Sequence, residues 1–179
     1  WQMPRRRLAA ESVRDAMLAA SGELDPRRGG SPLGLELTGN IRGAGGNVNP
    51  ANWGGKIFED VRNRRSVYLP FKRERPVGQL EILSVFNFPH PNDITGARPN
   101  TTVATQALFL LNAPFVKKQS ARLADRLNKN QPEDERARVN QLYLVTISRP
   151  ATTDEIATAM AFLDQCTEDL QGNRSAAWT

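Results

Sequence analysis

Glycine is concentrated in one stretch of this 179-residue chain, and that stretch limits what the chain can fold into. Residues 22–55 hold 10 of the 13 glycines, and no helical or strand periodicity survives there. Loops longer than ~15 residues without regular structure are uncommon in compact domains. We therefore expect a Gly/Asn-rich excursion at about residues 22–62, set into a domain that the flanking sequence builds.

Apolar residues recur at helical spacing on both sides of this excursion. A first helix is expected over residues 4–20, because Pro4 suits a first turn and Gly22 suits a helix end. Its apolar stripe is expected to comprise Leu8, Val13, Ala16, Met17 and Ala20. Further helices are predicted over about residues 79–86, 114–128, 134–148 and 153–170, and over a segment that is capped by Thr102 or Thr105 and runs to Asn112.

One segment favours a strand. Val67 and Leu69 alternate with Tyr68, and Pro70 ends the segment or places it at a sheet edge. The predicted fold class is mainly α: an irregular helical domain with about five helices, a short strand element at Ser66–Phe71 and the long Gly-rich loop. Residues 1–179 are expected to form a single helical domain, a fragment of a longer chain.

The net positive charge of the chain comes from its first part. Residues 1–75 hold 14 Lys/Arg against 8 Asp/Glu, whereas residues 76–179 hold 10 against 11. Such a field attracts an acidic partner, although a basic face that is merely solvated has the same pattern. The candidate partner-binding basic patch comprises Arg5, Arg6, Arg7, Arg62, Arg64, Lys72, Arg73 and Arg75.

Several classes of chemistry lack the residues they need. One cysteine (Cys166) and one histidine (His90) cannot supply a haem c attachment motif or the usual ligands of zinc. No phosphate-binding loop with its Lys-Ser/Thr ending is present, and no serine lies in a nucleophile-elbow motif. We expect no catalytic residues, no metal and no cofactor in this chain. No apolar run is long enough to span a membrane.

The candidate polar cluster centres on two carboxylates. Glu11 and Asp15 are four residues apart, so they share one helix face. They could act as an acid/base pair, but we favour an arginine–carboxylate network that links this helix to the strand and to the loop near residue 98. Under that hypothesis Arg65→Ala lowers the melting temperature. The cluster comprises Glu11, Arg14, Asp15, Arg65, Asp93, Arg98 and Asn100.

Nucleic-acid binding is the third hypothesis, because the sequence pI is 9.9. Against it, the aromatic residues beside the basic clusters alternate like core strand residues, whereas stacking platforms need exposed rings. No helix-turn-helix or RNA-recognition motif appears in the sequence. We therefore do not expect nucleic acid as a partner.

Five sequence motifs, in order, resemble one family. They are Pro4–Leu18, Arg65–Pro70, Phe86–Pro89, Thr102–Asn112 and Arg149–Glu155. Together they are similar to the C-terminal "PSD" domain of unknown function in planctomycete cytochrome-c-associated proteins. Members often carry an acidic residue where Asn87 and His90 stand here, which argues against a shared catalytic role for this loop.

The resemblance implies a periplasmic or extracellular protein whose missing upstream part often includes a haem-c module. We therefore expect a non-catalytic structural or interaction domain of a large extracytoplasmic protein. Its basic N-terminal half would dock other domains of the same polypeptide, or another acidic partner or polymer. The alternative is a part of an active site that is shared with the upstream region, with a polysaccharide as substrate.

Overall fold

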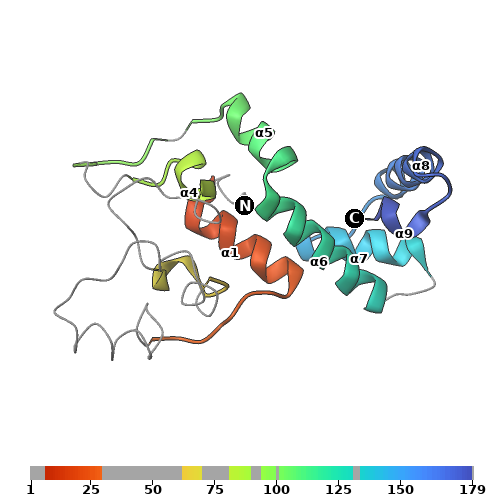
Figure 1. The fold of residues 1–179 in the computed structure, drawn as a ribbon, viewed down its shortest axis with the longest axis horizontal. Helices are drawn as coiled ribbons and strands as arrows, with labels where there is room; N and C mark the ends of the chain where they lie inside the picture. The colour runs from red at the N-terminus through yellow and green to blue at the C-terminus, as the bar shows by residue number, and fades with distance from the viewer. Residues whose placement is uncertain are drawn as a thin grey trace, which may run out of the picture. The chain divides into compact units, whose positions relative to one another are not determined.

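The computed structural model describes residues 7–29, 62–69, 81–89, 94–99, 101–130 and 134–178. Within these ranges the chain is mainly helical (Figure 1), as the sequence predicts. Residues 30–61, which make up most of the Gly/Asn-rich excursion, lie outside the described residues, so the long loop stays a prediction.

Seven α-helices are described, more than the five or so expected for the fold. Six of them fall on the helical ranges predicted from the sequence, and the seventh, the short last helix, had no sequence signal. The helices are α1 (Ala10–Ser21), α4 (Glu81–Val85), α5 (Ala104–Asn112), α6 (Pro114–Asn130), α7 (Glu135–Ile147), α8 (Thr153–Asp169) and α9 (Arg174–Ala177). None of those helices is long and apolar enough to cross a membrane.

The predicted strand is wrong for Ser66–Tyr68, which form the 3-10 helix η2. The backbone N–H of Ser66 donates to the Asp15 carboxylate, and those of Tyr68 and Leu69 donate to the carbonyls of Arg65 and Ser66. These hydrogen bonds to α1 and within the turn replace strand pairing. In the described part of the chain, β pairing is limited to one isolated parallel bridge between Asp25 and Arg64.

Helix α1 begins later than predicted and ends where predicted. Residues 7–9 are not helical, and the first helical backbone bond of the element runs from the Val13 N–H to the Ala9 carbonyl. Gly22, just after the helix, has φ 81°, a left-handed conformation that glycine adopts without steric cost. The prediction that residues 7–9 belong to the helix is therefore wrong.

The chain forms two compact units, 1–15 with 24–110, and 16–23 with 111–179. In the first unit, described side chains that are almost fully buried include Ala10, Ile82 and Leu83. The two buried apolar residues of α4, Ile82 and Leu83, thus form the centre of a small core. The expectation that residues 1–179 form a single domain stays a prediction.

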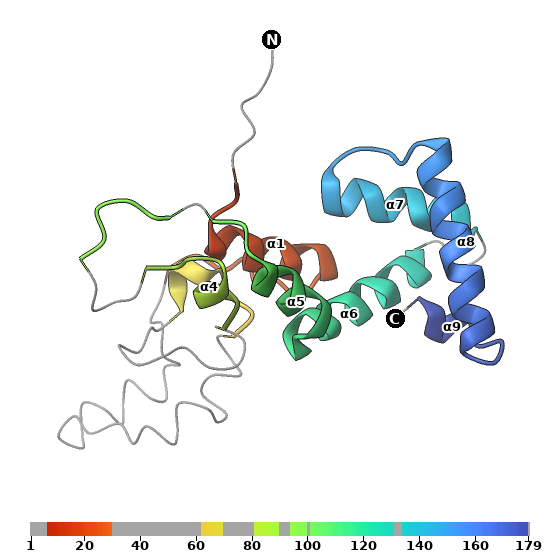
Figure 2. The ribbon, with the colours of Figure 1, turned by 90° about the horizontal axis from the view of Figure 1, so that it is seen from above.

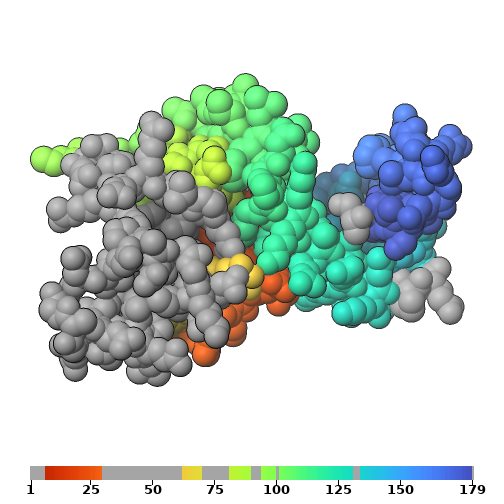
Figure 3. Space-filling view, viewed as in Figure 1, coloured from red at the N-terminus to blue at the C-terminus, as the bar shows by residue number. Residues whose placement is uncertain are grey.

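In the second unit, the C-terminal helices pack in chain order. Contacts join α6 to α7, α7 to α8, and α8 to α9. Figure 2 shows α8 running past α7 and turning back into the short α9, and in Figure 3 the blue side chains of α8 and α9 form one continuous mass. The described buried side chains are Leu18, Ser21, Ala113, Phe115, Gln119, Ala124, Leu127, Val139 and Leu163.

Local capping explains why α7 and α8 begin and end where they do. Asp134 caps α7 by accepting a hydrogen bond from the Ala137 N–H, and Ser148 ends that helix with φ 58°. Thr152 and Glu155 form a reciprocal capping box at the start of α8. The sequence predicted the start of this helix from Thr153, Asp154 and Glu155, whereas the capping residue is Thr152.

Candidate functional site

The described centre of the candidate polar cluster is a buried arginine. The side chains of Ala10, Arg14 and Leu18 are 0–1% exposed, so one face of α1 buries an arginine between two apolar residues. The predicted apolar stripe is wrong in that it includes Leu8, which is 59% exposed, and omits these three buried residues. A buried guanidinium must find acceptors, because leaving its N–H groups unpaired costs free energy.

Arg14 finds those acceptors on the segment just before η2. Its Nη1 donates to the Arg64 carbonyl at 3.0 Å and to Ser66 Oγ at 3.2 Å, and its Nη2 donates to the Arg62 carbonyl. Burial lowers the pKa of Arg14 to about 10, while the neighbouring Asp15 carboxylate acts in the opposite direction. The side chain therefore stays charged at neutral pH and fixes residues 62–66 against α1.

The two candidate carboxylates are both paired. Asp15 Oδ1 accepts from Arg14 at 3.4 Å and from the Ser66 hydroxyl at 2.7 Å, and Asp15 Oδ2 lies 3.8 Å from Arg65 Nε. Glu11 Oε2 accepts from Arg98 Nη1 at 2.8 Å. The structure thus brings together Glu11, Arg14, Asp15, Arg65 and Arg98 in the pairing that the network hypothesis describes.

The members of the network are not equivalent. Arg65 is 53% exposed and its ion pair is long, so its contribution is that of a surface pair. Arg14 is fully buried and has three uncharged acceptors besides Asp15. The sequence analysis chose Arg65 as the residue whose loss should lower the melting temperature, whereas the geometry makes Arg14 the more important residue for stability. Asp93 and Asn100 lie outside the described residues.

The predicted basic patch has three described members, Arg7, Arg62 and Arg64. Arg5, Arg6, Lys72, Arg73 and Arg75 lie outside the described residues. Of the others, Arg64 is buried, with its guanidinium carbon 4.6 Å from the centre of the Tyr68 ring. Its Nη2 donates to the Gly29 carbonyl. Arg64 is therefore packed inside the first unit and is not part of an exposed basic surface.

Arg7 joins the segment before α1 to the start of α5. Its Nη2 donates to Gln106 Oε1 at 2.7 Å, and its guanidinium carbon lies 5.9 Å from the centre of the Phe86 ring. Gln106 is 5% exposed, and its Nε2 donates to the carbonyls of Val85 and Thr101. This buried glutamine was missed from the sequence, because a polar residue among leucines gives no periodic signal.

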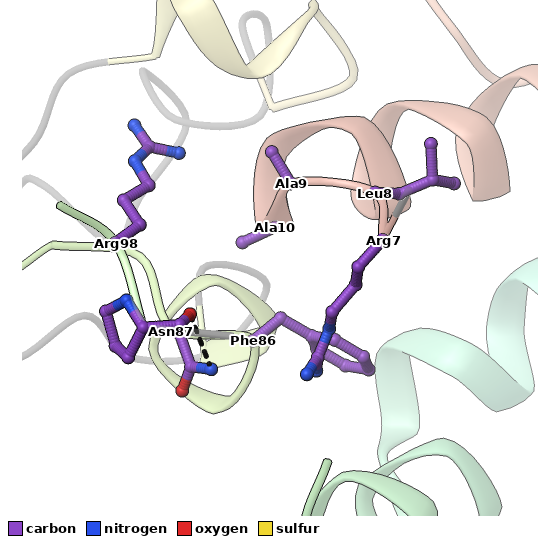
Figure 4. A pocket seen from close by; sticks show the side chains of 8 residues that line it. Arg7, Leu8, Ala9, Ala10, Phe86, Asn87 and Arg98 are labelled. Atoms are coloured by element: carbon purple, nitrogen blue, oxygen red, sulfur yellow. Dashed lines mark hydrogen bonds between the residues drawn. The ribbon is translucent and has the colours of Figure 1, made fainter. Parts of the chain in front are cut away.

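A small pocket of about 220 Å³ lies in the first unit beside Arg7. Figure 4 shows Arg7 on one side of it and Arg98 on the other, with Phe86, Asn87 and Ala10 between them. Asn87 has φ 62°, and its amide donates to the Pro99 carbonyl at 3.3 Å and to Thr101 Oγ1 at 2.8 Å. These bonds connect the turn after α4 to the segment that carries Arg98.

A second arginine cluster, in the C-terminal unit, was not predicted. Arg174 makes two bonds to the Glu135 carboxylate, at 2.9 and 2.6 Å, and one to Asp164 at 2.7 Å. The hydrogen bonds from Arg174 lower the pKa of Glu135 to about 2, and those to Glu135 raise the pKa of Arg174. The indole N–H of Trp178 also donates to Glu135, at 3.3 Å. The cluster anchors α9 to α7 and α8.

The described residues contain no group of three or more His, Cys, Asp or Glu side chains that could hold a metal ion. What the described candidate site offers is paired carboxylates, a buried guanidinium and one small cationic pocket.

The architecture is thus that of a mainly helical domain organised by arginine–carboxylate contacts. The model of one family, PSD1, a protein of unknown function (DUF1553), matches residues 1–163. The chain belongs to this family, which confirms the resemblance at the level of a domain of unknown function. No curated protein and no solved structure matches the chain.

Proposed function

We propose that this chain is a non-catalytic structural or interaction domain of a larger extracytoplasmic protein, associated with cytochrome as in planctomycetes. Its basic N-terminal half docks an acidic domain of the same polypeptide or another acidic partner. The observation that carries the proposal is the pairing of Glu11 with Arg98 and of Asp15 with Arg14. A general acid or base needs a carboxylate that is free to exchange a proton with a substrate.

The charge distribution supports the docking part of the proposal. Residues 1–75 carry six more Lys/Arg than Asp/Glu, whereas residues 76–179 carry one fewer. Arg65 and Arg98 keep 53% and 46% of their side chains exposed while they are paired. An exposed guanidinium presents several donors, so each can contact a partner's carboxylate without leaving its internal one.

The test measures association between this chain and the upstream half of the full-length protein over a range of salt concentrations. Docking through charge should weaken on the order of tenfold between about 0.05 and about 0.5 M salt, since screening shortens the reach of each charge. The variant Arg65→Gln/Arg98→Gln should bind less tightly. The matched control, Arg122→Gln/Arg136→Gln, removes the same charge from exposed positions in the second unit.

Association that is independent of salt, or weakened equally by both double variants, would contradict docking through the basic half. The catalytic alternative, an active site shared with the upstream region, requires an unpaired carboxylate. Among the described members of the polar cluster, Glu11 and Asp15 are the carboxylates, and both are paired.

A further inference from the structure

The guanidinium of Arg7 lacks an anionic partner among the described residues. Its Nη2 bonds to Gln106, which is neutral, and its Nη1 is buried without any hydrogen-bond partner. A buried cationic nitrogen that has lost its hydration and gained no acceptor raises the free energy of the folded state. An anion in contact with the part of Arg7 that lines the pocket would offset its positive charge.

The pocket next to Arg7 has space for such an anion. Its volume of about 220 Å³ is below the usual range of sites for drug-sized ligands, so it fits a small molecule. Its walls combine a cation at either side with apolar surface between them (Figure 4). The residues that line it include Arg7, Ala9, Ala10, Phe86, Asn87 and Arg98.

Charge balance among the described residues indicates the kind of anion. Arg98 is compensated by Glu11, with 2.8 Å between Nη1 and Oε2, whereas no described carboxylate compensates the positive charge of Arg7. One negative charge neutralises the pocket, whereas a phosphate group would leave excess negative charge near neutral pH. A carboxylate also matches the planar fork of a guanidinium, and Arg98 keeps donors that its bond to Glu11 does not use.

The apolar walls indicate the rest of the ligand. Ala9, Ala10 and the ring of Phe86 offer carbon surface that an inorganic ion leaves uncovered. A short hydrocarbon attached to the carboxylate would bury this surface, with a gain proportional to its area. We propose that the pocket is a binding site for a small organic carboxylate, placed between Arg7 and Arg98. The site does not depend on docking of an acidic partner.

The test titrates the full chain with sodium propionate at constant ionic strength and follows the Nε–H resonances of arginine by NMR. Saturable shifts are expected at Arg7 and Arg98. Arg98→Gln should weaken propionate binding about tenfold through loss of one charge-assisted contact, and Arg122→Gln should leave it unchanged. Arg7→Gln should abolish binding, and where that variant fails to fold, Arg98→Gln decides, because its side chain is 46% exposed.

Three outcomes would overturn the proposal. Shifts that grow without saturation would show that propionate acts only as an electrolyte. Equal weakening by Arg98→Gln and Arg122→Gln would show a general effect of charge. Tighter binding of inorganic phosphate than of propionate would show that the pocket selects a dianion. If propionate binds but the salt-dependent association with the upstream half is absent, this site stands and the docking proposal fails.

Discussion

Asp15 accepts two hydrogen bonds from Ser66, at 2.8 Å from its backbone N–H and at 2.7 Å from its hydroxyl. The carboxylate therefore satisfies the first backbone donor of η2 and fixes the Ser66 rotamer at the same time. Ser66 Oγ also accepts from Arg14 Nη1, so three side chains and one backbone group form a closed set. These hydrogen bonds, in place of strand pairing, hold residues 62–66 against α1.

Replacement of Arg14 should be the most damaging change in this set. Arg14→Met leaves the Arg62 and Arg64 carbonyls and the Asp15 carboxylate without their buried donor. We expect the free energy of unfolding to fall by about 3–5 kcal/mol, as measured by urea titration. Arg65→Ala is the control, with an expected cost below about 1 kcal/mol because that pair is exposed. A larger effect from Arg65→Ala than from Arg14→Met would contradict the assignment.

Glycine is required after α1 because of its backbone conformation. Gly22 has φ 81°, and a Cβ there would lie 3.6 Å from Arg126 Cδ, an ordinary contact. The cost of Gly22→Ala is therefore backbone strain, about 1–2 kcal/mol in the free energy of unfolding. Gly96→Ala is the matched control, because Gly96 has no such φ and no described residue places an atom within 4 Å of its Cβ position. Equal midpoints for the two variants in thermal unfolding would argue against the strain.

Acid should release the C-terminal helix. The pKa of Glu135 is about 2 in the folded chain and about 4.3 in an unfolded one, so the stabilisation is present above about pH 4.3. It is lost as the pH falls from there through about 2, because the protonated carboxyl no longer pairs with Arg174. The indole N–H resonance of Trp178, which reports the bond to Glu135, should move over this range.

The control for this titration is Glu135→Gln, which keeps the shape of the side chain and removes its charge. In this variant the Trp178 resonance should show no step below about pH 4.3. A step of unchanged size would contradict the assignment of the titration to Glu135.

The capping box of α8 gives a prediction with a control in the same helix. Thr152→Ala removes the acceptor of the Glu155 N–H and should lower the free energy of unfolding by about 1 kcal/mol. Thr158→Ala removes the same hydroxyl from an exposed position inside α8, where alanine is the better helix former, and should be neutral or stabilising. Denaturant unfolding measures both, and equal losses would exclude a capping effect.

Elements that depend on neighbouring residues were predicted well. The start of α8 is set by Thr152 and Glu155, the end of α1 by Gly22, and the start of α6 by Pro114. In each case the controlling residue lies within three positions of the boundary. Local chemistry of this kind acts over the range that periodicity and capping rules describe.

Elements that depend on contacts between residues far apart in the sequence were not predicted. The alternation at Val67, Tyr68 and Leu69 predicts a strand, but Asp15 binds the Ser66 N–H from 51 positions away. Arg174 and Glu135 are 39 positions apart, and Arg7 and Gln106 are 99 apart. No window along the sequence contains both partners of these contacts. The carboxylate pairing was anticipated because Glu11 and Asp15 already share one helix face.

The corner between α7 and α8 is formed entirely from nearby parts of the chain. Ser148 turns it, Arg149 binds Glu155 at 2.6 and 2.8 Å, and Asn140 accepts from the Ala151 N–H at 3.0 Å. Each of these contacts closes a loop of about a dozen residues or fewer, which carries a small entropy cost. We therefore expect this helical hairpin to assemble early in folding and to offer α9 a ready surface on which to dock.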